Sequence, residues 1–183
     1  MRRLAVVASL TLSCAALAAD VESRQLTHYL PQDFLEASVR KEDWSEVKLD
    51  VKGGVRKGDV VRVWAAGVID RGNGDQPGQN VNGPSGLTET ERTKAGVEIK
   101  KLVLSQQAAD AFALLVKTDV ATHRRCPEPG KPLEIKLTKD KERLWIGFND
   151  EKGRYMDNHL GKGRRHESDP LWMRIEVVRT IVD

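Results

Sequence analysis

The chain has 183 residues, of which 39% are hydrophobic, and its 30 basic and 27 acidic side chains give a net charge of +3. This near balance does not indicate a nucleic-acid partner. Beyond the N-terminal segment, no run approaches the roughly 20 apolar residues that a membrane-spanning helix requires.

The N-terminal segment has the three parts of an export signal. Arg2 and Arg3 form a positive start, Leu4 to Leu12 is a short apolar run, and Ala16 to Ala19 supply small residues for cleavage before Asp20. We therefore predict a signal peptide over residues 1–19 and an exported protein, either periplasmic or secreted. Removal of the two arginines lowers the net charge from +3 to +1.

The two cysteines suggest further expectations. Cys14 follows Thr11 to Ser13 in a pattern similar to a bacterial lipobox, so acylation there is the alternative to a free protein and would tether it to a membrane. Cleavage leaves Cys126 alone, without a partner for an intrachain disulfide. The preceding Arg124 and Arg125 favour a reactive thiolate, but without an identifiable base an inert thiol is the competing interpretation.

Residues 20–44 form a predicted N-terminal extension, with a short helix near Gln32 to Val39 that Asp33 opens after Pro31. The pattern then changes to strict alternation of apolar and polar residues. Each alternating run is short and bounded by Gly, Pro, Asn or Asp, which predicts an all-β domain over residues 45–183, an antiparallel β-sandwich. The predicted strands lie at Val47–Val51, Val60–Ala65, Phe112–Val116, Leu133–Leu137, Leu144–Phe148 and Leu171–Val177.

Three segments remain open in this pattern. Glu98 to Leu115 has apolar spacing that would also suit a short helix before the Phe112 strand. Asp70 to Glu91 is a long polar loop, of the kind that is often functional. The basic run Lys162 to Arg165, flanked by His159 and His166, is either a solvated face or a patch for anions.

The loop after the Leu144–Phe148 strand has the strongest chemical signal. It places Asp150, Asp157 and Asn158 close together in sequence, with Gly153 allowing a turn between them. Calcium binds six to eight oxygens from carboxylates, amides and backbone carbonyls. The same residues are also ordinary members of Asx turns, so composition alone leaves both interpretations open.

Several motifs occur in a recognisable order along the chain: Gly58-Asp59 leading to Ala65-Ala66-Gly67, Gly83-Pro84-Ser85-Gly86, Asn149-Asp150, Gly153-Arg154-Tyr155, Asp157-Asn158 and Gly161. This order and spacing resemble the PA-IL-like (LecA-type) bacterial calcium-dependent galactose-binding lectins over about residues 51–178. The resemblance implies a galactose-binding, jelly-roll-like sandwich that binds a carbohydrate or glycoconjugate through calcium.

The resemblance also implies a set of site residues. Calcium would be held by the Asp150, Asp157 and Asn158 side chains and the backbone carbonyls of Arg71 and Arg154. The sugar would contact Asp150, Asn158 and His159.

Departures from the family pattern leave the sugar specificity open. The family supplies a His and a Gln after its Gly-Pro-x-Gly loop, whereas Leu87 to Thr93 contains neither. Arg71 and Arg154 bring positive charge where the family has neutral residues, and His159 replaces a small residue.

Two other functional classes compete with a lectin. One is a cell-envelope structural module that keeps the fold, has lost sugar binding and contacts a protein partner through the Asp70 to Glu91 loop. The other is a hydrolytic enzyme that pairs Asp150 with Glu151 or Asp157. We expect no enzymatic activity, because catalytic signatures such as Gly-x-Ser-x-Gly and His-Glu-x-x-His are absent from the sequence and carboxylates that bind calcium are poor proton donors.

Three tryptophans alternate opposite the apolar strand faces, where they would pack the second face or form a platform for sugar rings: Trp64, Trp145 and Trp172.

Overall fold

The structure, a computed structural model, describes residues 21–72, 80–161 and 169–181. The predicted signal peptide with Cys14, and the basic run with His166, lie outside these ranges. In the part of the chain that the structure describes, no helix is long and apolar enough to cross a membrane.

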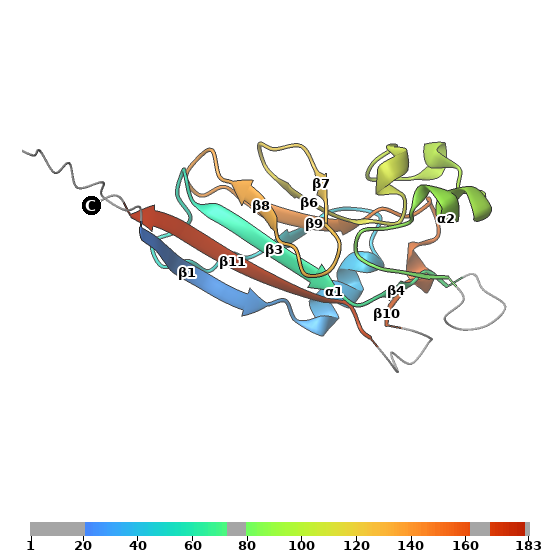
Figure 1. The fold of residues 1–183 in the computed structure, drawn as a ribbon, viewed down its shortest axis with the longest axis horizontal. Helices are drawn as coiled ribbons and strands as arrows, with labels where there is room; N and C mark the ends of the chain where they lie inside the picture. Colours follow the sequence, from blue (N-terminus) through green and yellow to red (C-terminus); the bar gives the residue numbers. More distant parts are fainter. Residues whose placement is uncertain (1–20, 73–79, 162–168, 182–183) are drawn as a thin grey trace, which may run out of the picture.

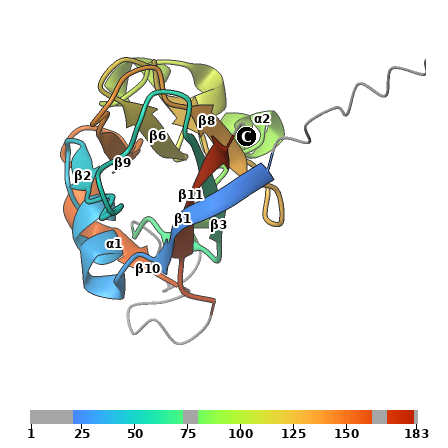
Figure 2. The ribbon, with the colours of Figure 1, turned by 90° about the vertical axis from the view of Figure 1, so that its left-hand side faces the viewer.

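The fold is built from antiparallel sheets with little helix, which confirms the predicted all-β sandwich (Figures 1 and 2). One sheet has the strand order β1-β11-β3-β8 and faces a second with the order β2-β9-β6-β7. A small sheet, β10-β4-β5, lies at one end of the sandwich. The elements are β1 (Val21–Tyr29), α1 (Gln32–Val39), β2 (Ser45–Val47), β3 (Val60–Ala66), β4 (Ile69–Asp70), β5 (Val81–Asn82), α2 (Glu89–Lys94), β6 (Leu114–Thr118), β7 (Arg124–Arg125), β8 (Leu133–Lys136), β9 (Leu144–Phe148), β10 (His159–Leu160) and β11 (Trp172–Ile181).

The core lies between the two larger sheets, where strand alternation sends every second side chain inward. In β3, Val61, Val63 and Ala65 are buried while their neighbours are partly exposed. In β11, Met173 and Ile175 are completely buried. The apolar positions identified from the sequence are therefore the positions that hold the two layers together.

The segment predicted as an N-terminal extension is part of the sandwich. Strand β1 pairs with β11 along its length, from Val21 opposite Ile181 to Tyr29 opposite Arg174. Helix α1 has the predicted bounds and buries Leu35 and other side chains against the core. Strand β1 is difficult to recognise from sequence because it is a polar edge strand whose register is interrupted by a bulge.

Four further segments differ from the sequence prediction. The run predicted as a strand at Val47–Val51 leaves the sheet after Val47, where β2 ends, although Val51 is buried. Residues 98–115 contain two 3₁₀ turns (Ile99–Lys101 and Ala108–Asp110) rather than an α-helix. Strand β6 begins at Leu114, two residues late, because Phe112 has a φ of 54° that does not fit a strand. Helix α2 was not predicted, although Thr88 and Glu91 form a capping box at its start.

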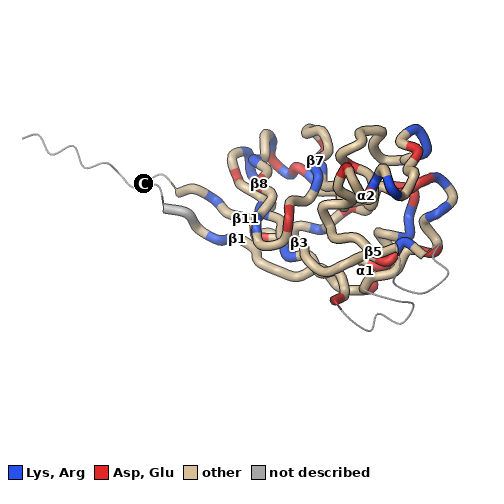
Figure 3. The backbone as a smooth tube through the Cα atoms, turned by 45° about the vertical axis from the view of Figure 1, so that its right-hand side comes forward, with Lys and Arg blue, Asp and Glu red and all other residues tan. Residues whose placement is uncertain are grey.

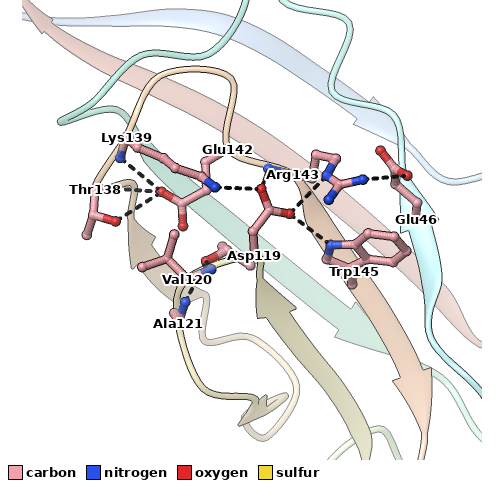
Figure 4. Close-up of polar contacts among 10 residues, drawn as sticks. Glu46, Asp119, Val120, Ala121, Thr138, Lys139, Glu142, Arg143 and Trp145 are labelled. Atoms are coloured by element: carbon pink, nitrogen blue, oxygen red, sulfur yellow. Dashed lines mark hydrogen bonds and ion pairs between the residues drawn. The ribbon is translucent and has the colours of Figure 1, made fainter.

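A polar network fastens the turn between β8 and β9 to the end of β6 (Figure 4). The carboxylate of Asp119 accepts hydrogen bonds from Arg143 Nε at 3.0 Å and Trp145 Nε1 at 3.2 Å, and pairs with Lys139 Nζ at 3.0 Å. The buried Glu142 carboxylate accepts from two backbone N–H groups of the turn. These contacts are structural and tie the turn that leaves β8 of the first sheet to strands of the second sheet.

Candidate metal and ligand site

The residues of the predicted site come together at the end of the sandwich that carries the β10-β4-β5 sheet. Asp150 follows β9, and the loop returns through a 3₁₀ turn (Tyr155–Asp157) to β10. Strand β10 pairs with β4 so that His159 is opposite Asp70. The pairing of two short strands therefore joins segments that lie far apart in the sequence.

Three oxygen atoms in this cluster are buried without a hydrogen-bond partner in the described part of the chain. They are Oδ2 of Asp150, Oδ1 of Asp157 and Oδ1 of Asn158. Asp150 is 2% exposed and Asn158 is completely buried. A buried polar atom without a partner is costly, and such atoms in a native protein require an explanation.

Burial raises the pKa of Asp150 from 3.8 to about 6. The Asn158 amide, the backbone N–H of Glu151 and the Arg71 charge act in the opposite direction but do not outweigh burial, and the charge of Asp157 raises the pKa further. These influences also show that Asp150, Asp157 and Asn158 neighbour one another. In the metal-free protein, ionised Asp150 is therefore a destabilising buried charge.

Asp150 lines a pocket of about 370 Å³. The pocket combines charged and amide side chains with an apolar wall, and this mixture is typical of small-ligand sites. It is lined by Arg71, Gly72, Asn80, Ala95, Val97, Phe112, Asp150, Glu151 and Arg154. Asp157 reaches the same place from behind Gly72, since a Cβ atom added to Gly72 would lie 2.9 Å from its Oδ2.

The backbone around the site is fixed by side chains that the sequence analysis did not assign. Asn158 Nδ2 donates to the Val39 carbonyl at 2.8 Å, and Arg40 donates to the Met156 carbonyl at 2.9 Å. Glu42 accepts from the Gly153 N–H at 2.5 Å. Helix α1 and the residues after it therefore brace the site loop, which gives residues 32–44 a structural role.

His159 belongs to the same brace. Its Nδ1 lies 3.2 Å from Oε1 of Glu36 on α1, and the Leu160 N–H donates to the other Glu36 oxygen at 3.0 Å. His159 is not among the residues that line the pocket. Of the predicted sugar-contacting residues, the structure thus brings Asp150 and Asn158 together and places the His159 ring against α1.

Asn149 was part of the recognised motif but was not assigned a role. Its buried side chain accepts from the Leu104 and Ser105 N–H groups and donates to the Ser105 and Asp110 carbonyls, at 2.9–3.0 Å. Because all four hydrogen bonds are made within the protein, Asn149 is not available to a ligand. It holds residues 104–110 against the start of the site loop.

Two other candidate groups lie in the described part of the chain. Cys126 is completely buried, and burial raises the pKa of its thiol to about 12, which favours the inert thiol over the reactive thiolate. Asp110 accepts from Ser105 at 2.6 Å and contacts His123 Nε2 at 2.8 Å. In a hydrolytic triad the serine donates to the histidine, whereas here the buried Ser105 donates to the carboxylate.

The three tryptophans of the outer faces contact neighbouring side chains, although Trp172 stays 37% exposed. The guanidinium of Arg174 lies 4.0 Å from the Trp64 ring centroid, and that of Arg143 lies 5.1 Å from the Trp145 ring. Trp172 meets the Tyr29 ring edge-on at 5.8 Å. Cation–π and edge contacts therefore account for these rings.

Among the described residues, no group of three or more His, Cys, Asp or Glu side chains is arranged to hold a metal ion. The set in this cluster is two carboxylates and one amide, all with oxygen donors. Hard oxygen donors with open lone pairs fit calcium. Neither a protein-family model nor a curated protein matches this chain.

Proposed function

We propose that the protein is an exported, non-enzymatic, calcium-dependent carbohydrate-binding protein. The observation that carries this proposal is the group of three buried oxygens, on Asp150, Asp157 and Asn158, without hydrogen-bond partners in the described chain. One cation would satisfy all three and would neutralise the two carboxylates. The backbone carbonyls of Arg71 and Arg154 would complete the protein's contribution.

Bound calcium supplies coordination positions that neighbouring sugar hydroxyls can occupy in place of water. The chain itself contributes the shape of the pocket. Ala95, Val97 and Phe112 provide an apolar wall for the carbon face of a ring. Asn158 Nδ2 donates one hydrogen to the Val39 carbonyl, and Asn158 Oδ1 has no partner in the described chain, so this oxygen is the atom available to a cation.

A hydrolytic function is the second candidate, because a pKa of about 6 suits Asp150 to a general acid and Glu151 lines the same pocket. A general acid, however, accounts for Asp150 alone. It leaves the open oxygens of Asp157 and Asn158 unexplained, whereas one cation accounts for all three. Turnover of chromogenic glycosides in chelator would favour the hydrolase instead.

The test is the thermal midpoint of the protein in 10 mM calcium and in chelator. For a site with the modest affinity of extracellular calcium modules, this concentration is about 10 to 100 times Kd and stabilises the fold by about 1.4 to 2.7 kcal/mol. The midpoint should rise by several degrees, and Asp157→Asn should abolish the rise. Glu128→Gln, which removes an exposed carboxylate remote from the cluster, should retain it. No calcium-dependent rise in the unmodified protein would refute the proposal.

Glycan-array binding at saturating calcium then separates a lectin from a cell-envelope interaction module. Calcium-dependent binding to defined glycans is the expected result. A calcium-stabilised protein that binds no glycan would instead support the interaction module.

A further inference from the structure

We infer that Glu36, Arg40 and Glu42 are positioning residues for the calcium site, and that the affinity for calcium depends on them. They belong to the bracing segment, residues 36–42, which comprises the second half of α1 and the residues directly after it. The site loop, residues 150–160, contains all the predicted side-chain ligands. This inference rests on the proposed function and deepens it, since it assigns part of the ion's affinity to a segment that holds none of the ligands.

The bracing segment runs antiparallel to the site loop and contacts it at four points, and α1 lies beside β10 in both views (Figures 1 and 2). In order along the loop, the contacts are Glu42 to the Gly153 N–H at 2.5 Å, Arg40 to the Met156 carbonyl at 2.9 Å, the Val39 carbonyl to Asn158 Nδ2 at 2.8 Å and Glu36 to the Leu160 N–H at 3.0 Å. Each step forward in the loop is matched by a step backward in the segment. The segment therefore supports the loop along its length rather than at one anchor.

The contact with Asn158 determines which atom of its amide is left for the ion. Its Nδ2 donates to the Val39 carbonyl, at the end of α1 where the last carbonyls have no partner within the helix. Reversal of the amide would set oxygen against oxygen at this point, because a carbonyl only accepts hydrogen bonds. The helix end thus selects the orientation in which Oδ1, the buried atom without a partner in the described chain, remains for a cation.

Arg40 and Glu42 hold the backbone on either side of the predicted ligand Arg154. The guanidinium of Arg40 holds the peptide group that joins Met156 to Asp157, and Glu42 holds the N–H of Gly153, the residue before Arg154. The directions of a backbone carbonyl and of the next side chain follow from the peptide groups beside them. Groups that orient metal ligands in this way typically change metal affinity by about 10- to 100-fold when they are removed.

The middle of the site loop has little other support. Residues 152–154 and Met156 are exposed, and a Cβ atom added to Gly153 would meet no atom within 4 Å. Acidic and basic residues are interspersed along the described chain (Figure 3). The attachment of the bracing segment to the loop therefore depends on individual hydrogen bonds rather than on attraction between two oppositely charged surfaces.

A coupling of this kind acts in both directions. If the bracing segment strengthens calcium binding, bound calcium strengthens the attachment of the segment by the same factor. Calcium should therefore slow hydrogen exchange in α1, for example at the Arg40 N–H, which donates to the Glu36 carbonyl at 3.2 Å. Helix α1 holds none of the predicted ligands, so a role confined to packing would leave the affinity for calcium unchanged when its polar contacts are removed.

The test is calorimetric titration of the protein and its variants with calcium, at a temperature where each is folded in chelator. Glu42→Ala should weaken calcium binding by about tenfold, the lower end of the range for groups that orient ligands. Glu42→Gln should retain most of the affinity, because its amide oxygen can still accept from the Gly153 N–H. Arg40→Met keeps the apolar stem without the donor and should also weaken binding.

Two control variants separate positioning from charge and from stability. Asp43→Ala removes a carboxylate one residue from Glu42, but this carboxylate accepts from the Trp44 N–H at 2.7 Å rather than from the loop. Asp119→Asn weakens the polar network of the β8–β9 turn, which makes no contact with the site loop. Both controls should bind calcium as tightly as the unmodified protein.

The outcomes separate this inference from the proposed function. The inference alone is overturned if Glu42→Ala and Arg40→Met both bind calcium as tightly as the unmodified protein. A loss in Asp43→Ala as large as that in Glu42→Ala, or no slowing of exchange in α1 by calcium, would also overturn it. Absence of calcium binding by the unmodified protein would overturn the proposed function, and the inference with it.

Discussion

Replacement of Asp150 by asparagine should make the metal-free protein more stable while removing its response to calcium. The pKa of Asp150 is raised from 3.8 to about 6, mainly by burial. Since one pKa unit corresponds to about 1.4 kcal/mol, the ionised carboxylate destabilises the metal-free fold by about 3 kcal/mol at neutral pH. Asparagine has nearly the same shape and no charge.

The expected gain is smaller than this upper value, because the new amide group must itself find an acceptor. We expect Asp150→Asn to stabilise the protein in chelator by about 1 to 2 kcal/mol at pH 7, which corresponds to a melting temperature about 3 to 6 °C higher for a chain of this size. In the unmodified protein, the destabilisation by ionised Asp150 is complete above about pH 6. It fades as the pH falls towards 3.8, because the carboxyl group binds a proton more tightly in the folded state than in the unfolded state. The difference between the two proteins should therefore be largest at pH 7 and close towards pH 4.

The same comparison in calcium should reverse the order of stability. The unmodified protein gains about 2.7 kcal/mol when calcium is at 100 times Kd, and the variant gains little. Asp157→Asn is the control, since its half-buried side chain should give a smaller gain in chelator and the same loss of response. A variant that is less stable than the unmodified protein in chelator, or one that keeps the full calcium response, would refute this reasoning.

Three further predictions concern stability. Asn149→Ala should destabilise the protein by at least about 3 kcal/mol in urea unfolding, because four backbone groups lose their partner; a loss below about 1 kcal/mol would contradict this. Gly72→Ala should weaken the calcium response, because the new Cβ atom would lie 2.8 Å from Cβ of Asp157. Gly130→Ala is the control, since Gly130 also has a positive φ but lies in open space, so this variant should carry only the backbone cost. Equal calcium responses in the two variants would count against the predicted site. The pKa of Asp119 is lowered to about 2, since its hydrogen bonds outweigh desolvation, so its contribution is present above about pH 4 and is lost as the pH falls through 2. Asp119→Asn should cost about 1 kcal/mol at pH 7 and much less at pH 2 in chemical unfolding. An equal cost at both pH values would disprove the linkage.

The sequence was most informative where one face of an element is buried. Five of the six alternating runs contain strands, because burial of one face requires a period of two. The run at Val47–Val51 is the exception, since β2 ends at Val47. Strand β1 was missed because its partner β11 lies at the other end of the chain and its own side chains are largely polar. Residues 98–115 have apolar spacing suited to a helix, but the side chain of Asn149 binds their backbone in an irregular path, which local spacing does not encode.

The site was predictable to a similar extent. The sequence order of Asp150, Asp157 and Asn158 was sufficient to nominate one loop, and the structure brings them next to Arg71. The brace from α1 could not be foreseen, since its hydrogen bonds join Glu36 to His159 and Val39 to Asn158 across more than half of the chain. The pocket wall formed by residues 95–97 likewise depends on how a loop returns to the sheet, which only tertiary contacts determine.

The pairing of the first described strand with the last has a consequence for presentation. Val21 lies opposite Ile181, so the chain enters and leaves the sandwich at the same end, whereas the site lies at the other end (Figure 1). A lipid, a tag or a neighbouring domain joined at either terminus would therefore hold the pocket pointing away from the attachment. If the proposed carbohydrate binding holds, molecules tethered side by side on a surface would display their pockets outward as an array. Several weak single-site contacts would then combine into firm adhesion to a repetitive polysaccharide.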